Sequence, residues 1–580
     1  MHRTSEQSES QGSPHPYWIT VQTARTVLIV VHTMTAWNRL SDILPVFDSD
    51  RRIQLIFTFP DVSKVTGDVE EQLRTSGAQT IPWERALTDN FDLAISVHHS
   101  GDLHRISAPL AVLSHGVGYS KIARESRIEN RESRIENRES RIENVYGLGR
   151  EWLVRDGRVP DAVVLAHVAD RQRLARTAPE ALPHTVIAGD PCFDRMQASR
   201  HLRPAYRVAL GAAGRTVVTV SSTWGPQSLL GRHPDLIDDL LSELPLDDYL
   251  VTAILHPNVW FAHGPWQIRT WLADALRSGL RLIPPISGWQ QAVLAADLMI
   301  GDHGAVTTYA AAHEVPTMLA SFPRDEVATG SAADLLGELA PRLDPGLPLP
   351  DQIGRAITTY DRTRMRAVRA LATSHPGACL DTLRATFYRL LCLPEPGRPA
   401  PEFPYPAEAL APHDDPVQAC RVTCEWHEDP EDGPTARLRR WPADVTPRRN
   451  RGHRATESCL VVHAAHPRRD LNGNADAVVV PVRPGIDTDE VLRQQLRDRP
   501  GCGIAVAEVD PGRLRLLRRD GLLVEAVIPG SAHGPMVPAV IAAAVHTGPE
   551  KSRVGDRPMT LLIGDRRISV DLKEIDTGSH

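Results

Sequence analysis

The residues best suited to chemistry in this chain occur in the segment IGDHGAVTTY, residues 300–309. A short apolar strand, a turn and an alanine-rich helix are predicted in that order. Where a parallel strand leads into a helix, unpaired N–H groups of the first helical turn can bind phosphate. The glycine allows close approach of an anion, the threonines supply hydroxyl donors, and the aspartate could accept from a ribose or hold an imidazole. These residue types predict a site that binds the diphosphate of a nucleotide. The alternative is an ordinary turn with polar residues. The candidate donor-binding residues of this segment are Asp302, His303, Gly304, Thr307 and Thr308.

Two further predicted strands in the same half of the chain also end in polar residues. TVVTVSSTWG, residues 216–225, ends in a hydroxyl cluster that includes Thr223, and YLVTAILHPN, residues 249–258, ends in His256, Pro257 and Asn258. Helix-like stretches alternate with these strands, which is typical of a parallel sheet. The carboxyl ends of parallel strands meet at one edge, so we expect Thr223, His256 and Asn258 to complete the donor site. The helix-like stretches are 235–244, 266–277 and 288–296.

A second reactive candidate lies in the first half of the chain, in LSHGVGYSK, residues 113–121. A predicted strand ends at His115, and Gly116 and Gly118 then open the backbone. Histidine at a strand end is suited to act as a general base, because its ordinary pKa lies near neutrality. The alternative is that His115 is a turn residue without a role in catalysis.

Length and composition limit the possible classes of protein. A chain of 580 residues with 42% hydrophobic and 24% charged residues is globular and too long for one core. A net charge of −7 argues against general nucleic-acid binding. Seven cysteines in so long a chain do not form a disulfide framework. Cys420, Cys424 and His427 lack a fourth ligand at a suitable spacing, so no metal site is predicted.

The predicted organisation is α/β, with two Rossmann-like halves, a cleft between them and a small C-terminal α/β module. No apolar run reaches the roughly 20 residues of a membrane span, and the N-terminus lacks the apolar core of a signal peptide, so a cytoplasmic protein is expected. The expected boundaries are a disordered leader at 1–18, an acceptor half at 19–205, a donor half at 206–393, a Pro/Arg-rich linker at 394–455 and the module at 456–580.

The heptad RESRIEN occurs three times without variation at residues 124–144, inside the first half. Each copy has two arginines, two glutamates and a single isoleucine. A two-stranded coiled coil needs apolar residues at two heptad positions, so a stable zipper is not expected. The composition favours a solvated helix stabilised by pairs of opposite charges. The insert is then either a surface extension or an arm that binds a protein partner.

Five motifs, taken in order, resemble the CDP-glycerol glycerophosphotransferase family of GT-B transferases, which build teichoic-acid-like polymers. SHGVGYSK resembles the family's His-Gly-Thr-Pro-x-Lys motif, and VIAGDPCFDRM resembles its Thr-Gly-x-Pro-Arg-x-Asp segment. SSTWG resembles a Pro-Thr-Trp strand end, and LHPN resembles a His-Pro pair. The last motif, AADLMIGDHGAVTTY, resembles Ala-Asp-x-x-Ile-Thr-Asp-Tyr-Ser-Ser. The resemblance extends over residues 25–395.

The resemblance implies that His115 deprotonates an acceptor hydroxyl, with Gly116 and Lys121 near the acceptor or its phosphate. It also implies that the second half holds a CDP-linked or UDP-linked donor, without a cofactor or a metal. Acceptors in this family are usually lipid-linked, which would bring the protein to the inner face of the membrane as a peripheral partner. The sequence departs from the motifs where His303, Gly304 and Ala305 replace Tyr-Ser-Ser and where Cys192 replaces an arginine.

The motifs are compatible with three functions. The first is transfer of a glycerol-phosphate, polyol-phosphate or sugar group from a nucleotide-diphosphate donor to a hydroxyl. The second is a UDP-sugar 2-epimerase or glycosyltransferase on the same fold. The third is a catalytically weakened scaffold that binds a protein partner through residues 124–144 or through the C-terminal module.

Overall fold

The structure is a computed structural model that describes residues 20–60, 67–114, 116–123, 145–410, 416–429, 433–446, 458–483, 485–529, 537–548 and 558–575. The heptad insert at 124–144 and His115 lie outside these ranges. The contacts of the chain divide it into two compact units, one formed by residues 1–195 and 371–403 and the other by the remainder. None of the described helices is long and apolar enough to cross a membrane.

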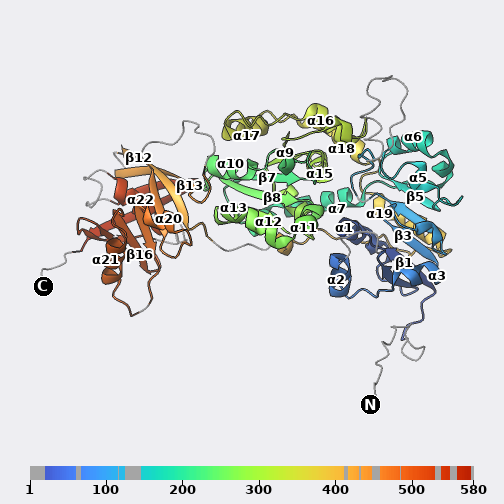
Figure 1. The fold of residues 1–580 in the computed structure, drawn as a ribbon, viewed down its shortest axis with the longest axis horizontal. Coiled ribbons are helices and arrows are strands. Elements are labelled where there is room, and N and C mark those ends of the chain that lie inside the picture. Colours follow the sequence, from blue (N-terminus) through green and yellow to red (C-terminus); the bar gives the residue numbers. More distant parts are fainter. Residues whose placement is uncertain are drawn as a thin grey trace, which may run out of the picture. The chain divides into compact units, whose positions relative to one another are not determined.

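The first unit contains a parallel sheet with the strand order β2-β1-β3-β4-β5-β6 (Figure 1). Its short strands are mostly apolar, and β3, β4 and β5 are fully buried, as expected of strands covered on both faces. The strands are β1 (Arg25–Val30), β2 (Ile53–Thr58), β3 (Leu93–Ser96), β4 (Leu110–Leu113), β5 (Ala162–Leu165) and β6 (Thr185–Ile187). The helices are α1 (Met34–Ile43), α2 (Gly67–Thr75), α3 (Trp83–Thr88), α5 (Arg150–Leu153), α6 (Val168–Thr177), α7 (Pro191–Ser199), which begins in this unit, and α19 (Cys379–Leu390).

Helix α19 returns to the first unit from much later in the sequence. Its Phe387 stacks on Phe47 with ring centroids 5.9 Å apart, and its Tyr388 donates a hydrogen bond of 2.7 Å to Asp50. Both aromatic side chains are almost fully buried. The apolar face of this helix therefore completes the core of a unit that begins more than 300 residues earlier.

The second unit contains a parallel sheet with the strand order β11-β10-β7-β8-β9 (Figure 1). Each strand is followed by at least one helix, which gives the alternation that the sequence predicts. The strands are β7 (Thr216–Ser222), β8 (Tyr249–Leu255), β9 (Arg281–Ile283), β10 (Leu298–Gly301) and β11 (Thr317–Leu319). The helices are α8 (Arg203–Ala209), α9 (Leu229–Arg232), α10 (Leu236–Glu243), α11 (Pro257–His263), α12 (Pro265–Trp271), α13 (Ala273–Arg277), α14 (Trp289–Ala295), α15 (Ala305–Ala312), α16 (Ala332–Leu339), α17 (Leu349–Thr358) and α18 (Arg362–Ala372). The prediction of two Rossmann-like parallel sheets is confirmed.

The C-terminal part of the second unit is a closed barrel with the strand order β12-β13-β19-β20-β18-β17-β16-β15-β14. One face of every strand and the apolar helix α22 (Val537–Thr547) form a single buried cluster, and Figure 1 shows α22 running among these strands. The strands are β12 (Ala419–Asp429), β13 (Gly433–Pro442), β14 (Cys459–His463), β15 (Ala477–Val480), β16 (Ile504–Asp510), β17 (Arg513–Arg518), β18 (Leu523–Val527), β19 (Met559–Ile563) and β20 (Arg566–Glu574), and the other helices are α20 (Arg469–Gly473) and α21 (Thr488–Asp498).

The hairpin β12–β13 lies inside residues 394–455, for which the composition predicts a linker. Its two strands pair in register from Cys420 opposite Pro442 to Asp429 opposite Gly433. The inward positions alternate with charged residues, for example buried Ala436 and Leu438 among arginines. The high arginine and proline content obscures this alternation in the sequence, so the structure corrects the predicted linker to two barrel strands. Cys420 and Cys424 lie on β12, and Cys420 belongs to the buried cluster.

Candidate functional site

The carboxyl edge of the second sheet is held together by the carboxylate of Asp302, directly after β10. Its Oδ2 accepts hydrogen bonds of 2.8 Å from the main-chain N–H groups of Thr223 and Leu229. Its Oδ1 accepts one of 2.9 Å from the N–H of Gly304. The side chain is fully buried, and burial raises the pKa of this carboxyl, while His303 and the three N–H groups oppose that rise. Asp302 thus joins the end of β10 to the end of β7 and to the start of α9.

This geometry changes the role predicted for Asp302. A carboxylate that accepts three internal hydrogen bonds at zero exposure is not placed to receive a ribose hydroxyl. The bond to the residue two positions later is a local turn that short acidic side chains favour. The other two bonds reach 79 and 73 residues back in the chain, which no local pattern reveals. We therefore assign Asp302 as a residue that positions the site.

Donor groups without protein partners surround this carboxylate. The hydroxyls of Thr223 and Thr307 are buried and have no hydrogen-bond partner within the described parts of the chain. The N-terminus of α15 has Gly304 as its cap residue, which gives no side-chain bond to the first-turn N–H groups. Thr308 instead donates to the carbonyl of Gly304 at 3.3 Å. The structure therefore brings together hydroxyl and amide donors at one strand end, as an anion site requires.

Gly304 allows this close arrangement because it has no side chain. A Cβ at this position would lie 3.0 Å from Oδ1 of Asp302 and 3.3 Å from Cβ of Thr223. Its φ of −73° is open to any residue, so the constraint is space and not backbone conformation. The glycine thus lets the start of α15 approach the end of β7.

His303 is buried in the same turn, with 6% of its surface exposed. Its Nε2 lies 3.3 Å from Oε2 of Glu326, and its Nδ1 has no partner among the residues that the structure describes. One imidazole nitrogen is thus engaged by an acid from the segment after β11. The other is available for a ligand atom.

The end of β8 lies beside the end of β7. The N–H of His256 donates to the carbonyl of Ser222 at 3.0 Å, and Nδ1 of His256 accepts from the N–H of Asn258 at 3.1 Å. His256 is thus the N-cap of α11, and its Nδ1 is engaged by this role. Both His256 and Asn258 are partly exposed, and they belong to the same sheet edge as Thr223.

In the first unit, the turn that follows β4 is held by Arg39. This buried arginine donates to the carbonyl of Gly116 at 2.7 Å and forms an ion pair of 2.7 Å with Asp190. Asp190 in turn accepts from the N–H of Phe193 at the start of α7. The adjacent His115 lies outside the described residues, so its role as a base stays a prediction. Arg39 is a positioning residue that the sequence motifs do not indicate.

The base of the heptad insert is closed by main-chain pairing. The carbonyl of Lys121 accepts from the N–H of Tyr146 at 2.8 Å, and Ile122 pairs with Val145 in an antiparallel bridge. The residues that flank the insert on either side are therefore adjacent, which is the geometry expected of an insertion that the fold tolerates. Lys121 lies at this base, a few residues beyond Gly116.

A cluster of histidines and tyrosines at the carboxyl ends of β1 and β3 was not predicted from the sequence. His32 stacks on His98 with ring centroids 4.9 Å apart, and Nε2 of His98 lies 3.2 Å from the hydroxyl of Tyr146. Nε2 of His99 lies 3.2 Å from the hydroxyl of Tyr119. The sequence did contain a pattern that could have indicated this cluster, because VVH and SVHH both end predicted strands. In the structure these two strands are neighbours in the sheet. We refer to His32, His98, His99, Tyr119 and Tyr146 as the histidine cluster.

The histidine cluster is neutral at physiological pH. Burial, together with repulsion from His98, lowers the pKa of His32 and of His99 to about 3, and burial lowers that of His98 to about 4. Burial raises the pKa of Tyr119 and of Tyr146. Neutral imidazoles both donate and accept hydrogen bonds, so the cluster can orient hydroxyl groups without adding charge.

Gly147 is required where the histidine cluster is most tightly packed. Its φ is 86°, and a Cβ there would lie 2.8 Å from Cδ2 of His99 and 2.9 Å from Cε1 of Tyr119. Only glycine meets both constraints. The main chain after the insert therefore packs directly on the cluster.

Within the described ranges, no three His, Cys, Asp or Glu side chains are grouped so as to hold a metal ion.

Comparison with known proteins gives weak likenesses. No protein-family model and no curated protein matches the sequence. Among solved structures, the wall teichoic acid polymerase TagF is 14% identical with a TM-score of 0.44, over 64% of this chain and 90% of that one. Anabaena HepE in complex with UDP-glucose is 16% identical with a TM-score of 0.36, over 63% of this chain and 99% of that one. A glycosyltransferase from Rickettsia africae is 11% identical with a TM-score of 0.34, over 63% and 97%. Likeness at this level does not decide the activity of this chain.

Proposed function

We propose that this chain is a GT-B-like transferase that moves a glycerol-phosphate, polyol-phosphate or sugar group from a CDP-linked or UDP-linked donor to a hydroxyl acceptor. The observation that carries the proposal is the carboxyl edge of the second sheet. There, buried Asp302 holds three main-chain segments together, so that an unpartnered hydroxyl of Thr223 lies beside the uncapped start of α15. Such a concentration of neutral donors fits the diphosphate of a nucleotide.

Each residue of this edge has a role in the proposal. Thr223, Thr307 and the first-turn N–H groups of α15 donate to the diphosphate, and Thr308 and Gly304 shape the turn. His303, held by Glu326, presents its free Nδ1 to the donor. His256 and Asn258 contact the donor from the neighbouring strand end. These groups stabilise the charge that develops on the nucleotide as it leaves.

In the first unit, His115 takes the proton of the acceptor hydroxyl. The acceptor oxygen then attacks the phosphorus or the anomeric carbon of the donor, and the nucleotide leaves with the electron pair of the broken bond. Arg39 holds the turn that carries His115, and Gly116 and Lys121 lie near the acceptor. The histidine cluster, at neighbouring strand ends, orients the acceptor hydroxyls.

Calorimetric titration of the purified chain with CMP, CDP, CDP-glycerol, UDP and UDP-N-acetylglucosamine tests the proposal. We expect saturable binding of one base series. The Thr223→Val variant should bind about tenfold more weakly, because a buried hydroxyl donor to a charged group is lost. The matched Thr270→Val change, at an exposed position of α12, should leave binding unchanged.

The outcomes separate the three functions. Binding of the cytidine series favours the glycerophosphotransferase reaction, and binding of the uridine series favours a UDP-sugar transferase or epimerase. Absence of binding by every nucleotide would contradict a donor site and favour the scaffold. Equal affinities for the wild type and Thr223→Val would remove the assignment of this strand end.

A further inference from the structure

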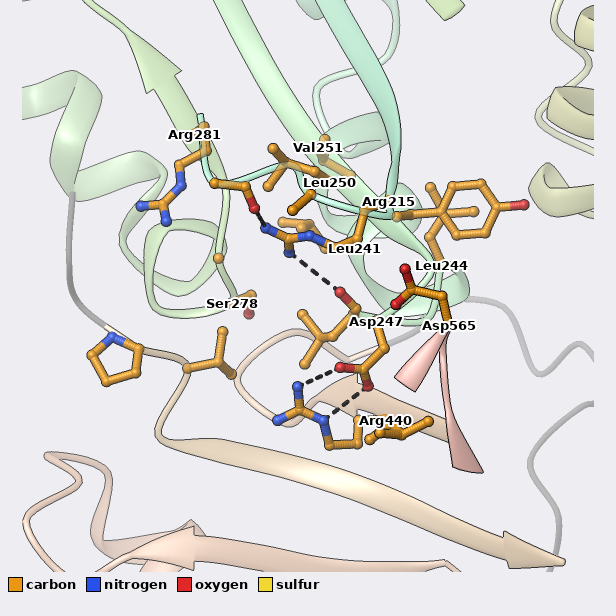
Figure 2. A pocket seen from close by; sticks show the side chains of 18 of the residues that line it. Arg215, Leu241, Leu244, Asp247, Leu250, Val251, Ser278, Arg281, Arg440 and Asp565 are labelled. Atoms are coloured by element: carbon orange, nitrogen blue, oxygen red, sulfur yellow. Dashed lines mark hydrogen bonds and ion pairs between the residues drawn. The ribbon is translucent and has the colours of Figure 1, made fainter. Parts of the chain in front are cut away.

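A second polar cavity lies at the opposite, amino edge of the same sheet, where the barrel adjoins it. Its volume is about 400 Å³, within the range of small-molecule sites. Arg215 immediately precedes β7, and Arg281 begins β9. The barrel contributes Arg440 from β13 and Arg566 from the start of β20. We call this cavity, with its four arginines, the arginine pocket (Figure 2).

The charges of the arginine pocket do not balance within its lining. Four arginines are accompanied by two aspartates, Asp247 and Asp565. Asp247 is occupied by Arg440, whose Nε and Nη2 donate to it at 2.9 and 2.7 Å. Figure 2 shows this pair, with Arg215 on the other side of Asp247. Asp248, next to Asp247 in the chain, lies beside the lining. Burial, together with the negative charges of Asp247 and Asp565, raises the pKa of its carboxyl.

Of the four arginines, Arg215 is the one that a bound anion would stabilise most. Its guanidinium donates to the carbonyls of Leu246, at 3.3 Å, and of Gly211, and across the described chain it pairs with no carboxylate. Burial, followed by repulsion from Arg281, lowers its pKa to about 10, with Arg440 and Arg566 adding to the repulsion and Asp247 opposing it. A bound anion would relieve this repulsion and accept from the remaining N–H groups.

A further part of the lining is apolar. Leucine and valine side chains from α10, from β8 and from the segment before β12 form the wall behind the guanidinium groups, namely Leu241, Leu244, Leu250, Val251 and Val417. A cavity with guanidinium groups on an apolar wall suits a ligand that has an anionic end and a less polar body. A free salt ion would satisfy only the first of these features.

We propose that the arginine pocket binds a phosphate ester or diphosphate ester, at a site separate from the donor edge. Guanidinium groups match phosphate oxygens in pairs, and several of them converging from two parts of the fold suit a group with two or more negative charges. The ester body would lie on the apolar wall. Such a ligand would bridge the sheet, through Arg215 and Arg281, to the barrel, through Arg440 and Arg566.

The arginine pocket and the donor edge are distinct places on the same strand. Arg215 precedes the first residue of β7, and Thr223 follows its last residue. Seven extended residues span roughly 23 Å, which exceeds the length of a diphosphate. One ligand cannot fill both places, so this proposal stands or falls independently of the proposed transferase activity.

Titration of the full chain with pyrophosphate, at constant ionic strength, tests the proposal by calorimetry and by the shift of the unfolding midpoint. We expect saturable binding and a higher midpoint, since a ligand that binds only the folded state stabilises it. Arg281→Gln and Arg566→Gln should each weaken binding roughly tenfold, because each removes charged hydrogen bonds. Asp565→Asn should strengthen binding, because it removes a competing negative charge beside the ligand.

A matched control makes the test specific. Arg269→Gln removes the same charge from an exposed position on α12, outside the lining, and should leave affinity unchanged. Pyrophosphate can also bind at the proposed donor edge, so Thr223→Val should weaken only that component and leave unchanged the component that depends on Arg281 and Arg566, which separates the two sites. Cytidine diphosphate and a soluble short-chain phosphatidic acid, used as competitors, distinguish a nucleotide from a lipid as the source of the phosphate group. Absence of saturable pyrophosphate binding, or equal binding by wild type and Arg281→Gln, would overturn the proposal.

Discussion

At the scale of single residues, Asp302 and Thr223 have different roles in the candidate site. The Asp302 carboxylate lies inside the fold and its three hydrogen bonds fix the main chain. The Thr223 hydroxyl is buried next to it and has no partner in the described chain. The first side chain therefore fixes the main chain at this strand end, and in the proposed donor site the second is expected to contact the ligand.

Replacing Asp302 by alanine should lower both stability and nucleotide affinity. The change leaves three buried N–H groups without an acceptor, and we expect a loss of about 3 kcal/mol in the free energy of unfolding. Thr223→Val, which keeps the shape of the side chain, should change stability by less than about 1 kcal/mol. Urea denaturation of both variants measures the difference. An Asp302→Ala protein as stable as the wild type would contradict the positioning role.

The buried histidines predict a pH dependence whose sign is fixed by their lowered pKa values. The pKa of His99 is about 3 in the folded chain, against an ordinary value of 6.5. Below pH 6.5 the unfolded chain takes up a proton that the folded chain does not, so stability falls as pH falls. For one such histidine the loss between pH 6.5 and 5.5 is about 1 kcal/mol.

The His99→Gln variant isolates this effect, because it cannot take up the proton in either state. The stability difference between wild type and variant should become about 1 kcal/mol smaller on going from pH 6.5 to 5.5. Asp170 and Asp194 act in the opposite direction, since burial raises the pKa of each to about 6, but both are present in both proteins and cancel. Chemical denaturation at the two pH values provides the measurement, and a constant difference would show that His99 is not buried as a neutral ring.

At the scale of elements, the approach of α15 to the end of β7 is the feature on which the donor edge depends. Gly304 is the N-cap of this helix, and a Cβ added there would lie 3.0 Å from Oδ1 of Asp302 and 3.3 Å from Cβ of Thr223, which is tighter than ordinary contact. A Cβ would move the first-turn N–H groups away from the Thr223 hydroxyl. The site is therefore sensitive to the position of a whole helix and not only to its own side chains.

The Gly304→Ala variant should lose roughly tenfold in nucleotide affinity, because donors displaced by a few tenths of an ångström no longer converge on one anion. Gly354→Ala is the matched control. It lies within α17 with nothing within 4 Å of its added Cβ, and should raise stability by about 0.5–1 kcal/mol without changing affinity. Calorimetric titration of both variants tests the expectation. Unchanged affinity in Gly304→Ala would show that the start of α15 does not contact the donor.

At the scale of the whole molecule, the barrel and the second sheet form one unit because buried polar contacts join them. Asp444, just after β13, is fully buried and accepts from Nε of Arg277 on α13 at 3.0 Å. Its other oxygen lies 3.1 Å from Nε2 of His466 in the barrel. One carboxylate therefore holds a helix of the Rossmann-like domain and a loop of the barrel.

Asp444→Ala should weaken this connection and uncouple the melting of the two parts. We expect a loss of about 2 kcal/mol, discounted from the value for a fully buried pair because Arg277 is partly exposed. In a calorimetric scan the barrel transition should separate from that of the sheet. Asp470→Ala, which removes an exposed pair with Arg468, should leave the scan unchanged. A single unshifted transition in Asp444→Ala would show that other contacts hold the two parts together.

The two parallel sheets and the positions of most strands follow from local sequence patterns. Runs such as TVLIVV and LMIG are apolar throughout and alternate with helical stretches, and these patterns follow from contacts between residues near in sequence. The sequence also located Thr223 and His256 directly after strands, and Gly304 and Thr307 in the turn and helix that follow β10, since a strand end is a local property. The prediction of a linker at 394–455 was wrong for the strands β12 and β13, because three of the ten residues of β13 are arginines and make the segment resemble a polar linker.

The roles of the polar residues at those strand ends depend on contacts between segments far apart in the sequence. Asp302 is a positioning residue because its partners lie more than 70 residues away, and Arg39 reaches Asp190 across 151 residues. The histidine cluster forms because β1 and β3 are neighbours, and the arginine pocket forms because a barrel closes against the amino edge of a sheet. A sequence pattern reports local geometry, whereas hydrogen bonding, burial and charge depend on which distant segments the fold brings together.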